Sequence, residues 1–107
     1  MSAADHAVVA VLQIHLHFPD AGSLKAKRSE LNAVKAGLQQ RFGAAVAEVE
    51  HQDTWQRSTL MAALCAGAPG RADDHVANLQ RWLDSRLPQG VRVERRLATW
   101  IDLESLG

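Results

Sequence analysis

The sequence predicts an α+β fold whose strands and helices follow one another in the order βαββαβ. Segments with an apolar residue at every second position alternate with segments whose apolar residues recur at spacings of three, four and seven. Short clusters of glycine and proline separate these segments. The chain has 107 residues and no linker or low-complexity segment, so we expect a single domain over residues 1–107 with one core.

The N-terminal half is expected to hold a strand, a helix and a hairpin. Residues 7–18 alternate between an apolar face and a face that turns polar toward its end, which is typical of a central strand covered by helices on one side only. A helix should follow, with Ser23 as its N-cap and Gly43 as its C-terminal stop. Residues 44–50 and 57–66 then read as two strands that pair antiparallel through the loop between them.

The C-terminal half is expected to hold the second helix and the fourth strand. Asp73 and Asp74 mark the helix start, because acidic residues stabilise helix N-termini, and Pro88 ends the helix. Residues 91–103 read as the last strand, and a break in its alternation at residues 95–96 is consistent with a bulge. Right-handed crossovers in this order place both helices on one face of a four-stranded antiparallel sheet, which is the ferredoxin-like fold.

Composition narrows the classes of site that the chain can carry. Lys plus Arg number 12 and Asp plus Glu number 12, so the net charge is zero and any basic site must be local. The single cysteine, Cys65, excludes an internal disulfide framework and lies in an apolar run, which favours a buried structural thiol. Trp82 and Trp100 also lie in apolar stripes, where core packing is the natural role.

Motifs of known chemistry are missing from the sequence. It contains no phosphate-binding glycine loop, nucleophile elbow or Cys/His zinc pattern, so we predict no catalytic residue, metal or cofactor, and a non-enzymatic role is favoured. The N-terminus has neither the pattern of a signal peptide nor a long apolar span. We therefore expect a cytoplasmic protein without membrane contact.

The order of elements brings three segments to one edge of the sheet, which we call the converging edge. With alternating strand directions, the start of the first helix, the 51–56 hairpin loop and the Pro88 turn all meet there. Lys25, Lys27 and Arg28 lie in the first turns of that helix, although the helix dipole disfavours cations at this end. Such a broken local preference indicates an anion site. The alternative is that solvent screening makes these surface charges harmless.

The facing hairpin is dense in side chains that donate, accept or stack. Trp55 could serve as a stacking platform and Arg57 as a phosphate contact. The alternative is that Trp55 covers the edge of the core while Asp53 forms an Asx turn. The candidate residues for binding nucleic acid or another anion are Lys25, Lys27, Arg28, His51, Gln52, Asp53, Trp55, Gln56 and Arg57.

Residues 23–29, SLKAKRS, and residues 47–57, AEVEHQDTWQR, resemble the two signatures of the YlxP-like family, small bacterial proteins of unknown function. The resemblance covers nearly the whole chain and is weakest over residues 67–74 and at the C-terminal tail. It implies a ferredoxin-like fold. It also implies a gene neighbourhood shared with transcription elongation, translation initiation and ribosome maturation factors, and so a connection with the ribosome or RNA. The family offers no established catalytic residues to carry over.

Three functions are compatible with these features. In the first, the protein is an RNA- or ribosome-associated accessory factor, with the basic helix start and Arg57 on phosphates and Trp55 on an unpaired base. The strands, however, lack the aromatic pattern of an RNA-recognition motif. In the second, the protein is a homodimeric structural or small-ligand-sensing module without catalysis, whose uncovered sheet face presents Val9, Val11, Met61 and Ala63. The third is an enzyme or metal site using His15, His17, His51 and Asp53, whose spacing is not diagnostic.

Overall fold

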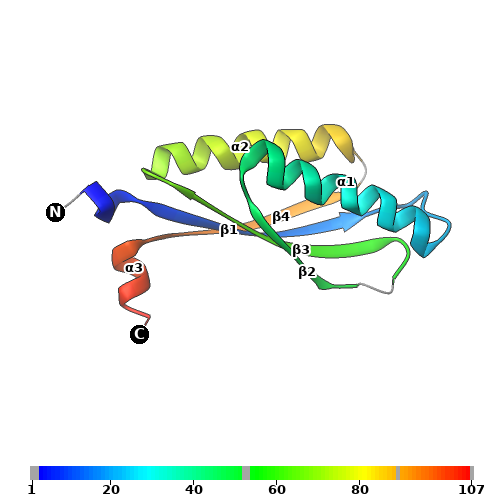
Figure 1. Ribbon diagram of the computed structural model, residues 1–107, viewed down its shortest axis with the longest axis horizontal. Coiled ribbons are helices and arrows are strands. Elements are labelled where there is room, and N and C mark those ends of the chain that lie inside the picture. The colour runs from blue at the N-terminus through cyan, green and yellow to red at the C-terminus, as the bar shows by residue number, and fades with distance from the viewer. Residues whose placement is uncertain (1–2, 52–53, 89, 107) are drawn as a thin grey trace.

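A computed structural model describes residues 3–51, 54–88 and 90–106 and confirms the α+β fold (Figure 1). The elements are η1 (Ala3–His6), β1 (Val8–His17), α1 (Leu24–Phe42), β2 (Ala45–Glu50), β3 (Arg57–Ala66), α2 (Pro69–Arg86), β4 (Val91–Thr99) and α3 (Trp100–Glu104). The sheet has four antiparallel strands in the order β2-β3-β1-β4. Helices α1 and α2 lie over one face, and we call the other face, which they leave uncovered, the open face.

Strand β1 lies at the centre of the sheet, as its two-faced pattern predicts. It pairs with β3 from Val8↔Ala66 to His17↔Arg57 and with β4 from Val8↔Thr99 to Leu16↔Val91. Its alternate residues toward the helices are buried, and they meet the inward stripes of α1 and α2. The main core residues from these three elements are Ala10, Leu12, Ile14, Leu16, Leu31, Val34, Leu38, Val76, Leu79 and Leu83.

Helix α1 begins and ends as predicted. The Ser23 hydroxyl accepts a hydrogen bond of 3.1 Å from the Ala26 N–H, and Gly43 ends the helix at φ 65°, a left-handed conformation that suits glycine. Gly37 faces α2, and a Cβ at this position would overlap the ring of Trp82. The missing side chain therefore lets the two helices approach each other around the tryptophan.

Helix α2 begins earlier than predicted. It starts at Pro69, whereas the acidic pair Asp73 and Asp74 lies one turn inside. Proline suits the first turn of a helix because its φ is already helical and no N–H is needed there. The start of this helix is therefore marked by Pro69 and not by the acidic pair.

The C-terminal strand is shorter than predicted. It ends at Thr99, where the chain turns into α3 through a capping box. The Thr99 hydroxyl accepts from the Asp102 N–H at 3.1 Å, and the Asp102 carboxylate accepts from the Thr99 N–H at 2.9 Å. The predicted bulge at residues 95–96 is also wrong, because β4 pairs with β1 without a shift. The irregularity of the sheet lies in β2, between Glu48 and Glu50.

Two expected core residues are exposed. Cys65 lies on the open face, because it alternates with the buried Leu64 and pairs with Val9. Trp100 is 59% exposed, because α3 lies away from the core on the side of the sheet opposite α1 and α2 (Figure 1). Trp82 does pack against the core, edge to face with Phe42. No helix in the described part of the chain is long and apolar enough to span a membrane.

Candidate functional site

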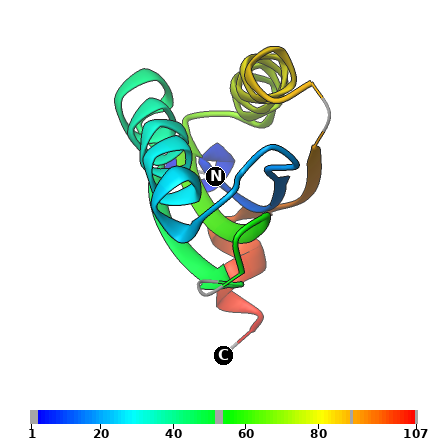
Figure 2. The ribbon, with the colours of Figure 1, turned by 90° about the vertical axis from the view of Figure 1, so that its right-hand side faces the viewer.

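Hydrogen bonds confirm that the three predicted segments meet at the converging edge, which lies at the right of Figure 1 and faces the viewer in Figure 2. The start of α1 is joined to the hairpin by Lys27, and the end of β1 is joined to the hairpin and to the turn after α2. The Phe18 N–H donates to the Gln56 carbonyl at 2.7 Å, which joins the end of β1 to the hairpin. The His17 N–H donates to the Gly90 carbonyl at 2.8 Å, which joins it to the turn after α2. The approach at Gly90 is so close that a Cβ there would lie 2.5 Å from the His17 carbonyl oxygen. Main-chain contacts therefore fix this edge.

Lys27 links the start of α1 to the hairpin from inside the molecule. Its side chain is 0% exposed, and Nζ donates a hydrogen bond of 2.5 Å to the His51 carbonyl. His51 has a φ of 63°, the left-handed conformation that few residues other than glycine adopt. The chain thus turns sharply after β2 at His51, the residue whose carbonyl accepts the hydrogen bond from Lys27.

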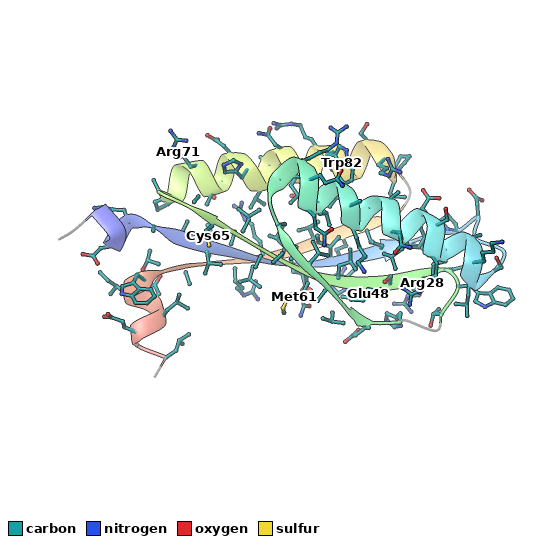
Figure 3. All side chains as sticks on the ribbon, in the orientation of Figure 1. Arg28, Glu48, Met61, Cys65, Arg71 and Trp82 are labelled. Atoms are coloured by element: carbon teal, nitrogen blue, oxygen red, sulfur yellow. The ribbon has the colours of Figure 1, made fainter. Side chains whose placement is uncertain are left out.

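Arg28 makes a second link between α1 and the sheet. Its Nη1 lies 2.7 Å from both carboxylate oxygens of Glu48 on β2 (Figure 3). Lys35 Nζ lies 3.3 Å from the same carboxylate. The Glu48 side chain is only 15% exposed. Burial raises the pKa of Glu48, but hydrogen bonds and charges from Arg28 and Lys35 outweigh burial, so the pKa lies below its ordinary value.

The remaining described residues of the predicted site are exposed. Trp55 is 52% exposed on the hairpin, and Lys25, Gln56 and Arg57 are also exposed. Across residues 3–51, 54–88 and 90–106, neither Lys25 nor Arg57 takes part in a salt bridge. Gln52 and Asp53 lie outside the described residues. The predicted site therefore divides into inner residues that join elements and outer residues that face solvent.

Residues from the open face extend the converging edge beyond the predicted site. His17 pairs in register with Arg57, and a cavity of about 460 Å³ is lined by both of them together with His15 and Arg92. Asp84 of α2 contributes an acidic group to the same cavity. Sequence reasoning placed His17 only in the enzyme or metal alternative and missed Arg92 as a site residue, although the two-residue period of their strands places both on one face.

His15 is held between two neighbouring strands. Its Nε2 lies 2.8 Å from a Glu94 carboxylate oxygen on β4, and its Nδ1 lies 3.4 Å from the Thr59 hydroxyl on β3. The hydrogen bond from His15 lowers the pKa of Glu94. Among the residues that the structure describes, no three His, Cys, Asp or Glu side chains are placed to hold a metal ion together. Through its contacts with Glu94 and Thr59, the His15 imidazole links the two strands that flank β1 on the open face.

These observations define the class of the protein: an α+β domain with a four-stranded antiparallel sheet and a polar converging edge. The chain belongs to the family described as a protein of unknown function, DUF503, whose model matches residues 9–95. The uncharacterized protein YlxP of Bacillus subtilis (strain 168) is 32% identical over 66 residues, which are 62% of this chain and 72% of that relative. The resemblance to the YlxP-like family is thereby confirmed.

Solved structures of low sequence identity share the fold. The 30S ribosomal protein S6 of Thermotoga maritima has a TM-score of 0.54 at 11% identity, covering 92% of this chain and 94% of that one. The de novo designed protein Foldit4 has a TM-score of 0.53 at 13% identity, covering 87% and 97%. SnoaB, a cofactor-independent oxygenase from Streptomyces nogalater, has a TM-score of 0.51 at 14% identity, covering 88% and 92%. At such low identities these likenesses concern the fold alone.

Proposed function

We propose that this protein is an RNA- or ribosome-associated accessory factor that contacts RNA through the converging edge. The observation that carries the proposal is the exposure of Trp55, which offers 52% of its surface on a hairpin beside the exposed Arg57. An exposed ring next to cations suits an unpaired base and its phosphates, because stacking and charge act together on single-stranded RNA.

The inner and outer residues have different roles in this proposal. Trp55 stacks on a base, and Lys25 and Arg57 contact phosphates. Lys27 and Arg28, whose cationic groups bind His51 and Glu48, are positioning residues that hold the hairpin against α1. The cavity lined by His17 and Arg92 gives the RNA backbone a path from the hairpin onto the open face.

Family context supports the same proposal. The gene neighbourhood implied by the YlxP-like resemblance links the chain to translation and ribosome maturation, and such a role would place it in the cytoplasm. That a 30S ribosomal protein has the same fold is consistent with this role, although the likeness does not reach the site residues.

Sedimentation with purified ribosomal subunits at two salt concentrations tests the proposal. We expect salt-sensitive cosedimentation that Trp55→Ala weakens, and we expect Lys25→Ala and Arg57→Ala each to reduce the slope of log affinity against log salt by about 0.7, the value for one phosphate contact on a single strand. Arg71→Ala is the matched control, because Arg71 is exposed on α2 at the other end of the molecule (Figure 3). Failure of the wild-type chain to sediment with subunits, or equal losses in the control, would contradict the proposal.

A second candidate function is a homodimeric structural or small-ligand-sensing module without catalysis. It is favoured by the apolar side chains of the open face, where Met61 is 40% exposed and where Val11 pairs in register with Ala63. Self-association through this face is compatible with RNA contacts at the converging edge. Light scattering at micromolar concentration should report a dimer, and a monomer at every concentration would remove this candidate.

A further inference from the structure

Helix α3 presents its apolar side chains to solvent. Trp100 is 59% exposed, Ile101 and Leu103 are exposed, and Leu106 after the helix is exposed as well. The Thr99–Asp102 capping box fixes the helix start, so the direction in which α3 leaves β4 is defined. Within its own chain, α3 packs mainly against β4 and η1. These apolar side chains therefore lack a covering layer in the described part of the chain.

The apolar half of the open face adjoins α3. Register pairs place Val9, Cys65 and Ala98 side by side across three strands, followed by Val11 and Ala63 and then Met61. Thr99, the residue before α3, pairs with Val8 at the same end of β1. The polar half, with His15, Arg57 and Arg92, lies at the other end. Helix α3 and this apolar half thus form one continuous surface on the same side of the sheet (Figure 1).

We propose that the partner of this surface is a second copy of the chain, and that α3 of each copy packs on the apolar half of the other copy's open face. This inference rests on the proposed homodimer and adds its contact element. Because α3 projects from the open-face side, a copy stacked on the apolar half must meet it (Figure 1). A two-fold axis repeats the contact, so each copy covers the helix and the sheet of the other.

Size and charge agree with a second copy as the occupant. The apolar half of this four-stranded face measures roughly 300 Å², and α3 adds to it, so the contact has the size of a small, concentration-dependent interface, below about 600 Å² per partner. The net charge is zero, so two copies do not repel each other. Residues 100–106 carry Asp102 and Glu104 and no cation, while Arg96 stands on the open face beside Val11. The acidic helix of one copy therefore complements the arginine at the rim of the other.

Cross-linking between single-cysteine chains tests the contact directly. An affinity-tagged Ile101→Cys, Cys65→Ala chain is mixed with the untagged wild-type chain, whose exposed Cys65 is its only cysteine, and treated with a short bis-maleimide. We expect a cross-linked heterodimer joined through positions 101 and 65. The matched control is a tagged Gln80→Cys, Cys65→Ala chain, because Gln80 is exposed on α2 on the far side of the sheet, and it should give no such product.

Sedimentation equilibrium separates this inference from the homodimer on which it rests. We expect a wild-type dimer whose dissociation constant rises roughly tenfold or more in Trp100→Ala, as for a buried aromatic anchor, and stays unchanged in Leu24→Ala, an exposed apolar residue at the start of α1. A wild-type dimer that gives no 101–65 product and is unaffected by Trp100→Ala would overturn the role of α3 alone. A wild-type monomer at tens of micromolar would overturn both the homodimer and the role of α3 in it.

Discussion

The buried amine of Lys27 lies 2.5 Å from the carbonyl oxygen of His51 and joins the first helix to the hairpin that carries Trp55. A lysine with no exposed surface contributes little to direct contact with a ligand, and its charge is best satisfied inside the molecule. The family signatures in residues 23–29 and 47–57 thus contain residues that build the hairpin as well as residues that face solvent. This division makes the stability and the binding of the converging edge separately testable.

Lys27→Met should destabilise the protein by about 1–3 kcal/mol, because the part-buried His51 carbonyl loses a charged donor. Lys25→Met is the matched control on the same helix turn. It should change the free energy of unfolding by less than about 0.5 kcal/mol, as usual for an exposed side chain. Urea unfolding at neutral pH measures both values. Equal effects of the two substitutions would contradict the linking role of Lys27.

Glu48→Gln should destabilise the protein by roughly 1.5 kcal/mol at pH 7, because Arg28 and Lys35 lose their charged acceptor. Since the pKa of Glu48 is lower in the folded than in the unfolded chain, its contribution is complete above the unfolded value of about 4.3 and is lost as the pH falls through the folded value. The difference between wild type and Glu48→Gln should therefore shrink with acidification. Urea midpoints between pH 7 and pH 3 follow it, and a constant difference would show that the carboxylate charge is not responsible.

Gly37→Ala should destabilise the protein by about 1–3 kcal/mol through overpacking against Trp82, although alanine is favoured over glycine in helices by about 1 kcal/mol. In a Trp82→Leu background the same change should become neutral or stabilising, because the smaller side chain leaves room for the added methyl group. Thermal unfolding of the four variants gives the coupling between the two positions. If the two substitutions changed the stability additively, the added methyl group at position 37 would not clash with Trp82, which would contradict the overpacking.

Much of the fold follows from periodicity in the sequence. Strand β1 shows its buried and open faces directly, and Ser23 and Gly43 mark the ends of α1 by their side-chain chemistry. Cys65 was misplaced because residues 60–66 are apolar throughout, which hides the two-residue period that puts the thiol on the open face. A continuous apolar run therefore predicts a strand without predicting which side chains are buried.

The C-terminal helix and the role of Lys27 depend on contacts that periodicity does not reveal. Residues 100–103 are mostly apolar and continue a strand pattern, although Thr99 with Asp102 three residues later is a local capping signal that could have revealed α3. Lys27 lies four residues before the buried Leu31, so its inward position was available from helical spacing. The hydrogen-bond partner of Lys27 could not be predicted from this spacing. The His51 carbonyl reaches the amine only because of a left-handed turn at His51 and the pairing of β2 with β3.

Ultraviolet cross-linking of the protein bound to ribosomal subunits, followed by trypsin and mass spectrometry, tests RNA contact at the converging edge most directly. Cleavage after Arg41 and Arg57 releases residues 42–57 as one peptide that contains Trp55. The proposed function predicts that this peptide carries a cross-linked nucleotide and that Trp55→Ala removes most of it. Nucleotides found only on peptides from α2 or α3, or on none, would contradict it.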